Sequence, residues 1–177
     1  MLQLGDTCLR AVERRDLPVT RVLRVDAAIA RGTLGRRFPI TEANEEAWFD
    51  GLGRGAFPDA AVWAIAAVEG AQSIVGIVQI AEIDWVHRTG WFGIWVAPDQ
   101  QGQGHGRRAT TLACAHAGHD LGLRQLRLRV LADNAAAIGV YHDAGYVDEG
   151  TQVAAVIIDG EPRDLVIMRL DLEGAPA

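Results

Sequence analysis

One short loop carries glycines and arginines at a spacing that suits the binding of a phosphate group. It reads Gln101-Gly102-Gln103-Gly104-His105-Gly106-Arg107-Arg108. Glycines let the backbone approach an anion closely and point successive N–H groups at it. A helix is expected to begin at Gly104, and the positive end of its dipole adds to the attraction. The loop therefore predicts a site for a phosphate or pyrophosphate group.

Two common phosphate-binding motifs do not fit this loop. A Walker loop ends in Gly-Lys-Ser/Thr, whereas Gly106 is followed by Arg107 and the chain contains no lysine. A dinucleotide fingerprint needs a glycine three positions after Gly104, where Arg107 stands. A nucleotide-binding protein that uses the loop for another phosphate ligand is therefore disfavoured.

The pattern Gln101-x-x-Gly104-x-Gly106, preceded by Val96-x-Pro98, resembles motif A of the GNAT acetyltransferase superfamily. The resemblance implies that a strand ending at Val96 lends backbone N–H groups to an acetyl carbonyl and to the pantetheine arm of acetyl-CoA. The loop amides and the two arginines would hold the pyrophosphate, with His105 over the phosphates. The coenzyme-binding residues implied here are Ile94, Trp95, Val96, Gln101, Gly102, Gln103, Gly104, His105, Gly106, Arg107 and Arg108.

A second pattern, Asn134-x-x-Ala137-x-x-x-Tyr141-x-x-x-Gly145-Tyr146, resembles motif B of the same superfamily. The resemblance implies that Asn134 and Ala137 lie beside the coenzyme, with Asn134 bonding the pantetheine region or an ordered water. It places Tyr141 beside the coenzyme sulfur. Acyl transfer needs the leaving thiolate protonated, and a tyrosine with a pKa near 10 keeps its proton at neutral pH. Tyr141 is the predicted general acid, and the alternative is a core tyrosine.

The general base is less well defined than the acid. Some members of the family carry a glutamate on the strand before motif A, but 91–96 contains no carboxylate. Glu82 and Asp84 lie two positions apart on the preceding strand, so in a regular strand their side chains would lie on one face. They can take the amine proton through water, form a pocket for a cationic substrate, or simply be a solvated strand end. His87 is a weaker candidate in the following turn.

Other arrangements of reactive residues are disfavoured. Cys114 and His116 would point about 200° apart on one helix, so a metal cluster with His119 is not expected. The only serine, Ser73, begins a strand and lacks the context of a nucleophile elbow. Cys114 lies among alanines, which favours packing over nucleophilic chemistry. The sequence therefore predicts neither a metal enzyme nor a serine hydrolase.

Composition narrows the class of protein. A chain of 177 residues suits a single domain, here 1–177. The formal charge of −6 argues against nucleic acid and suits a cationic partner. Two cysteines are too few for a disulfide framework. With no signal-peptide pattern at the start and no apolar run of membrane length, we expect a cytoplasmic protein that does not bind membranes.

The alternation of apolar residues and the turn signals predict an α/β fold of the GNAT type. We expect a mixed, mostly antiparallel twisted sheet of about seven strands flanked by about four helices, with a flexible tail at 171–177. Asp16 is the expected N-cap of the first helix, and Thr41 that of the second. The expected strands are 7–12, 60–68, 73–86, 91–96, 125–131, 145–157 and 163–170, and the expected helices are 16–30, 42–51, 104–121 and 134–143.

The layout is also similar to the GNAT branch that contains ribosomal-protein N-terminal acetyltransferases and several small-amine acetyltransferases. The resemblance implies an acetyl-CoA-dependent N-acetyltransferase in which the amine attacks directly in a ternary complex, without a metal. The acceptor stays open between a protein N-terminus and a small amine, bound by loops near 31–41 and 150–163. A non-catalytic acyl-CoA-binding module on the same fold is the alternative, and an exposed sheet edge can support a homodimer.

Overall fold

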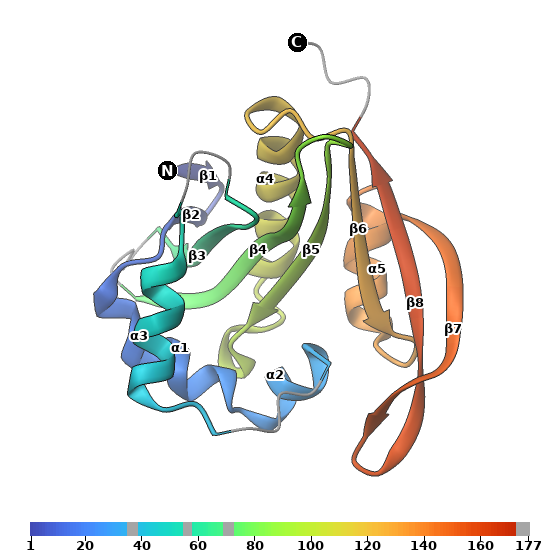
Figure 1. The fold of residues 1–177 in the computed structure, drawn as a ribbon, viewed down its shortest axis with the longest axis horizontal. Coiled ribbons are helices and arrows are strands. Elements are labelled where there is room, and N and C mark those ends of the chain that lie inside the picture. Colours follow the sequence, from blue (N-terminus) through green and yellow to red (C-terminus); the bar gives the residue numbers. More distant parts are fainter. Residues whose placement is uncertain (35–38, 55–57, 69–72, 173–177) are drawn as a thin grey trace.

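The computed structural model describes residues 1–34, 39–54, 58–68 and 73–172 of the chain. An eight-stranded sheet, in the order β1-β2-β3-β4-β5-β6-β8-β7, forms its frame (Figure 1). The strands are β1 (Leu2–Leu4), β2 (Thr7–Ala11), β3 (Ala61–Ala67), β4 (Ile74–Asp84), β5 (Thr89–Val96), β6 (Gln125–Leu131), β7 (Val147–Ile158) and β8 (Glu161–Asp171). The helices are α1 (Leu17–Arg24), α2 (Ala27–Gly32), α3 (Glu42–Gly51), α4 (His105–His119) and α5 (Ala135–Asp143), with 3₁₀ turns η1 (Arg14–Asp16) and η2 (Pro98–Gln100).

The centre of the sheet is open along part of its length. Neighbouring strands pair antiparallel except β5 and β6, which are parallel. That parallel pairing joins only Thr89–Trp91 to Gln125–Arg127. Beyond it the two strands separate, as Figure 1 shows. The later part of β5 therefore turns an edge without a strand partner toward β6.

Helices cover both faces of the sheet. In Figure 1, α4 lies behind β4 and β5, and α5 lies behind β6. Because side chains alternate along a strand, Val78 and Ile80 of β4 face the main core with the buried alanines of α4. Ile77 faces the other side, where it packs in a smaller cluster with Trp48 and Phe49 of α3. The split in the sheet thus lies between two helical layers.

The predicted α/β architecture is confirmed, with two additions in the described part of the chain. The eighth strand is β1, a three-residue strand that pairs with β2 and that sequence reasoning missed. The helix expected at 16–30 is two helices, because Asp26 begins α2 by accepting bonds from the N–H groups of Ala28 and Ile29. A side-chain cap of this kind competes with continuation of the preceding helix.

Asp16 does not cap α1 as predicted. Both of its carboxylate oxygens accept bonds from the Arg10 guanidinium, at 2.8 and 2.9 Å, and the Glu13 N–H donates to one of them. Both Asp16 and Arg10 are buried. The capping prediction for Thr41 is confirmed, since its hydroxyl accepts from the Asn44 N–H and α3 spans the predicted residues.

The chain stays ordered beyond the predicted start of its tail. Asp171 is the last residue of β8, and the Leu172 N–H donates to the Arg124 carbonyl at 2.7 Å. The rest of the predicted tail, 173–177, lies outside the described residues. Within the described part of the chain, no helix has the length and hydropathy of a membrane span.

Candidate active site

The glycine loop connects the end of β5 to the start of α4. After Val96 the chain makes the short turn η2, and α4 begins at His105 with Gly104 as its N-cap. Gly102 and Gly104 have φ angles of 75° and 83°, a left-handed conformation that favours glycine. A Cβ on Gly104 would also lie 2.7 Å from Nη1 of Arg108. The conformation that opens the first N–H groups of α4 to an anion therefore depends on this glycine.

Side chains of the loop hold its shape. The Gln101 amide nitrogen donates to the Val96 carbonyl at 3.0 Å, which closes the loop on the end of β5. Arg108 donates from Nη2 to the Gln103 carbonyl and from Nε to the Thr7 hydroxyl, at 2.7 and 2.8 Å. It also pairs with Asp6. Arg108 thus ties the loop to β2 and has a structural role.

Arg107 has a carboxylate partner on α5. Its Nη1 lies 2.5 Å from an oxygen of Asp143, and both side chains are about half exposed. No acidic residue stands in the first turn of α4, so none there opposes an anion at the helix N-terminus. Arg107 must exchange or share its bond with Asp143 to reach a phosphate.

The His105 side chain is turned toward the sheet. It is buried, and its Nδ1 lies 2.8 Å from the Thr7 hydroxyl of β2. The side chain of the first residue of a helix can turn back to the sheet while its N–H still points along the helix axis. Only the backbone of His105 is therefore placed to meet an anion.

The unpaired edge of β5 includes Ile94, Trp95 and Val96. All three pair with β4 on one side, yet they lie beyond the last residue of β5 that pairs with β6, Trp91. Backbone groups on such an edge need a partner, which a ligand can supply. The three residues thus lie where the resemblance expects backbone contacts to the acetyl group and the pantetheine arm.

Tyr141 lies in the last turn of α5 and is buried among aromatic rings. Its ring centroid is 6.1 Å from that of Phe92 and 5.8 Å from that of Tyr146. Burial, followed by the neighbouring Cys114 thiol, raises the pKa of Tyr141 to about 12. Its hydroxyl bonds to no other side chain in the described part of the structure. Tyr141 therefore keeps its proton at neutral pH.

Asn134 has a structural role at the start of the same helix. It is the N-cap of α5, and its side-chain oxygen accepts a bond from the Ala137 N–H at 3.2 Å. A side-chain oxygen at this position satisfies one of the free N–H groups of the first turn of the helix. The amide nitrogen of the Asn134 side chain is the part that can contact a coenzyme.

A cavity of about 150 Å³ lies on the opposite face of the sheet, between α1–α3 and the strands. Sequence reasoning missed it, because its walls come from segments that lie far apart in the chain. The guanidinium of Arg24 lies 4.8 Å from the Trp48 ring centroid and 3.0 Å from a carboxylate oxygen of the buried Glu45. The cavity is lined by Arg24, Ile29, Thr33, Trp48, Ile77, Gln79 and Trp95.

The predicted base candidates lie away from that cavity. Glu82 and Asp84 are both exposed, as their parity predicts, but the ladder is irregular between 81 and 84 and Glu82 has a φ of 49°. Asp84 accepts bonds from the Val86 and His87 N–H groups and from the His87 ring. These bonds, first that of the His87 N–H, lower the pKa of Asp84. Asp84 thus shapes a turn.

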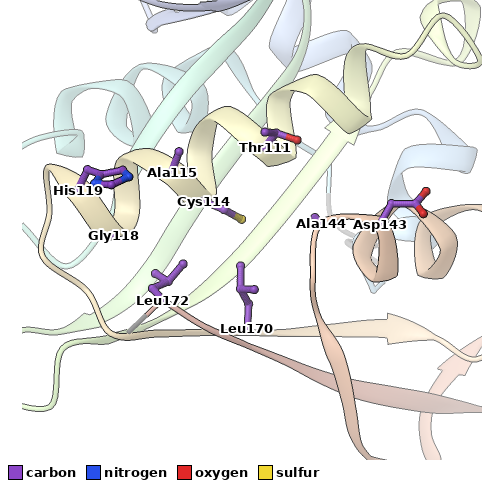
Figure 2. A pocket seen from close by; sticks show the side chains of 9 residues that line it. All are labelled: Thr111, Cys114, Ala115, Gly118, His119, Asp143, Ala144, Leu170 and Leu172. Atoms are coloured by element: carbon purple, nitrogen blue, oxygen red, sulfur yellow. The ribbon is translucent and has the colours of Figure 1, made fainter. Parts of the chain in front are cut away.

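A second hollow, of about 310 Å³, lies between α4, the end of α5 and β8. Figure 2 shows Cys114 on the face of α4 that looks toward Leu170 and Ala144. Burial raises the pKa of the Cys114 thiol to about 11, so it is not a reactive thiolate. The described residues hold no cluster of metal-binding side chains.

The chain belongs to the GNAT acetyltransferases: a family model described as "Acetyltransferase (GNAT) domain" matches residues 6–147. Spermidine N(1)-acetyltransferase of Vibrio cholerae is 34% identical over 99 residues, 55% of this chain and 57% of that protein. The Escherichia coli K12 enzyme of the same name is 36% identical over 93 residues, 52% of this chain and 50% of that protein. The chain spans about half the length of these curated relatives.

Two further comparisons cover nearly the whole chain. L-methionine sulfoximine/L-methionine sulfone acetyltransferase of Pseudomonas paraeruginosa is 26% identical over 163 residues, 89% of this chain and 90% of that protein. The crystal structure of the Vibrio cholerae spermidine N-acetyltransferase with CoA and spermine superposes with a TM-score of 0.86 at 24% identity, over 94% of this chain and 96% of that one. At that identity the superposition shows a shared fold.

Proposed function

We propose that this protein is an acetyl-CoA-dependent N-acetyltransferase that moves an acetyl group directly to a primary amine. One observation carries the proposal: the glycine loop and the N-terminus of α4 stand at the end of β5, next to the strand edge that β6 leaves unpaired. An anion at the loop and a thioester along that edge can belong to one extended coenzyme. The family of the chain uses acetyl-CoA in this way.

The proposed reaction begins when the neutral amine attacks the thioester carbonyl carbon. A C–N bond forms, and the tetrahedral oxyanion is stabilised by backbone N–H groups of β5. The C–S bond then breaks, and the thiolate takes the proton of the Tyr141 hydroxyl. The proton lost by the amine returns to Tyr141 through water, so that the products are the acetamide and free coenzyme A.

Burial acts on both partners of the proton transfer. A phenol with a pKa of about 12 is a weak acid toward an ordinary thiolate, whose pKa is roughly 8.5. The nearby Cys114 thiol has its pKa raised to about 11 by the same surroundings. A coenzyme thiolate in an equally dry position would be a stronger base than a solvated one, so burial narrows the difference in pKa between the acid and the thiolate from about 3.5 to about 1.

The cavity between α1–α3 and the sheet is the proposed acceptor site. Its wall includes Trp95, whose backbone belongs to the unpaired edge of β5, so a bound amine lies next to the expected thioester. Glu82 and Asp84 do not line it, and they stand three and five residues beyond Gln79 on β4. We therefore propose that neither carboxylate is the direct base.

A polyamine is the first proposed acceptor. The relatives with the highest identities among those above are named spermidine acetyltransferases. The indole rings of Trp48 and Trp95 offer apolar and cation–π surface to an aminoalkyl chain, and the net charge of −6 attracts polycations.

An amino acid is the second proposed acceptor, because Arg24 is the charged residue in the wall of the cavity. A guanidinium suits a carboxylate better than an ammonium group. The relative named for methionine sulfoximine also aligns with 89% of the chain. A protein N-terminus, expected from the ribosomal-protein branch, is a third acceptor to include in an assay.

We also propose a cytoplasmic homo-oligomer. The edge strand β7 exposes Val147, Val153 and Ile157 and has no partner beyond β8 in the described structure. One solved relative is described as dodecameric, with a TM-score of 0.78 at 24% identity. Light scattering of the purified protein measures the mass of the assembly.

The cysteines bear on the proposed compartment. Cys8 and Cys114 are unpaired and buried, which suits a reducing compartment.

Release of coenzyme A thiol from acetyl-CoA tests the proposal. The assay compares spermidine, L-methionine sulfoximine, free amino acids and peptides with free N-termini, each with and without protein. We expect thiol release that depends on a small amine and yields the matching acetamide by mass spectrometry. Binding of acetyl-CoA without transfer to any of these amines would favour the non-catalytic module.

A further inference from the structure

The C-terminus of α5 is built so that Tyr146 folds back onto Tyr141. The Tyr146 N–H donates to the Tyr141 carbonyl at 3.0 Å, and the Gly145 N–H donates to the His142 carbonyl at 2.9 Å. Gly145 has a φ of 94°, in the left-handed region. Together these features form a Schellman motif, in which the second residue past the cap contacts the last turn of the helix. The five-residue spacing of the two tyrosines follows from this motif.

Phe92 of β5 completes a cluster of three rings with these tyrosines. The centroid distances are 6.1 Å for Phe92–Tyr141, 6.0 Å for Phe92–Tyr146 and 5.8 Å for Tyr141–Tyr146. The Phe92 and Tyr141 rings meet edge to face, at 83°. Aromatic pairs favour such distances and angles. Each ring thus restricts the rotation of the other two.

The cluster is anchored on α4 as well. Tyr146 is 2% exposed, and its hydroxyl oxygen lies 3.6 Å from Sγ of Cys114. Phe92 and Tyr141 are 5% and 7% exposed. The ring of Tyr141 is therefore held from α4, α5 and β5, the elements that surround the proposed coenzyme site.

We propose that Tyr146 and Phe92 are positioning residues, which fix the Tyr141 ring so that its hydroxyl meets the leaving sulfur of the coenzyme. The inference rests on the proposed function. A general acid acts only within hydrogen-bond reach of the atom that it protonates, and a displacement of about 1 Å can cost roughly 10²-fold in rate. Tyr141 is aimed by packing, because its hydroxyl has no side-chain partner in the described part of the structure.

Kinetics of substituted proteins separate positioning from general packing. Tyr146→Phe keeps the ring and should leave kcat within about 3-fold, whereas Tyr146→Leu and Phe92→Leu should each lower kcat about 10-fold or more with little change in the KM for acetyl-CoA. Phe49→Leu is the matched control, since it removes a ring from the cluster on the other face of the sheet. It should not reproduce the loss of kcat.

A double-mutant cycle tests whether Tyr146 acts through Tyr141. In a Tyr141→Phe background the acid is absent, so Tyr146→Leu should lower kcat no further. A further 10-fold loss in that background would overturn the proposal. Unchanged kcat in Tyr141→Phe alone would remove the acid and the positioning role together, even if the enzyme is an acetyltransferase.

A spectroscopic measurement needs no activity, because the chain has only two tyrosines and both belong to the cluster. After 3-fluorotyrosine labelling, Tyr146→Phe and Tyr146→Leu each leave one ¹⁹F resonance, that of Tyr141. We expect a single narrow resonance that CoA shifts in the phenylalanine variant, and a broadened or split one in the leucine variant. Equal line shapes and equal CoA-induced shifts in both would overturn the proposal, whatever the outcome of the acceptor assay.

Discussion

The coenzyme half and the acceptor half of the proposed site are built in different ways. The coenzyme half, from Thr89 to Tyr146, is one continuous segment of strand, loop and helix, and most of its expected contacts come from the backbone. The acceptor half is a cavity whose walls come from α1, α2, α3, β4 and β5, and its lining is made of side chains. Short motifs can describe the first construction, whereas the second exists only after folding.

The two halves should differ in what they tolerate. Substitutions in the coenzyme half that alter backbone conformation should weaken the binding of acetyl-CoA with every acceptor. Substitutions in the acceptor half should change the choice of amine and leave acetyl-CoA binding intact. Four variants test this division.

Tyr141→Phe should have the largest effect. Loss of the acid should lower kcat by about 10² to 10⁴-fold, the usual range for general acid catalysis. Binding of acetyl-CoA, measured by calorimetry, should be nearly unchanged, because the ring and its contacts with Phe92 remain. Equal losses of kcat and affinity would mean that Tyr141 binds the coenzyme and does not donate its proton.

Asp16→Asn should destabilise the fold at the start of α1, the helix that carries Arg24 of the cavity wall. Burial by itself would raise the pKa of Asp16, but the bonds from Arg10 and from the Glu13 N–H outweigh it, and the pKa is lowered. Breaking such a buried pair costs about 3–5 kcal/mol of unfolding free energy, measured by denaturant titration at pH 7.

The pH dependence of that difference follows from the direction of the pKa shift. A carboxyl whose pKa is lowered by folding contributes stability above its unfolded pKa, about 3.9, and loses it as the pH falls through the folded pKa. The difference in unfolding free energy between wild type and Asp16→Asn should therefore be constant from pH 7 to about 5 and decrease below pH 4. An increase of this difference in acid would contradict the ion pair between Arg10 and Asp16.

Gly104→Val should selectively weaken the binding of acetyl-CoA. A valine at a φ of 83° is strained, and its Cβ would press on the Arg108 guanidinium. We expect the KM for acetyl-CoA to rise about 10-fold or more, since the N–H groups at the start of α4 lose their alignment. Gly139→Ala is the control, because Gly139 lies in α5 with open space around it, and it should leave this KM unchanged.

Trp48→Ala should give the smallest effect, restricted to the acceptor. Removal of one wall of the cavity should raise the KM for the amine about 10-fold, near the 1.5 kcal/mol lower value for burying a large apolar side chain. The KM for acetyl-CoA should stay within 2-fold, as a rough limit. A larger change in the coenzyme KM than in the amine KM would break the division between the two halves.

The local structure of the proposed coenzyme half could be predicted from the sequence because its determinants are local. The loop at 101–108 and the helix that begins near Asn134 depend on glycines and caps that can be read within a few residues. His105 shows the limit of such local reasoning: its imidazole lies against Thr7, a partner 98 positions away in the chain.

The features missed from sequence have different causes. Asp16 has the residue type of a helix cap, but in the folded chain its carboxylate accepts hydrogen bonds from Arg10 instead. The acceptor cavity joins Arg24 and Trp48 to strands β4 and β5 across the sheet, so no spacing in the sequence marks it. The break of the first helix at Asp26 was readable as an N-cap signal and was overlooked.

Amide hydrogen exchange tests the division of the site most directly. Protein alone, with CoA, and with CoA plus spermidine or L-methionine sulfoximine would be compared peptide by peptide. CoA should slow exchange in the loop from Val96 to Arg108 and at the start of α5, and the productive amine should add protection in α1 and α3. Protection by CoA confined to α1–α3, with the glycine loop unaffected, would contradict the assignment of the two halves.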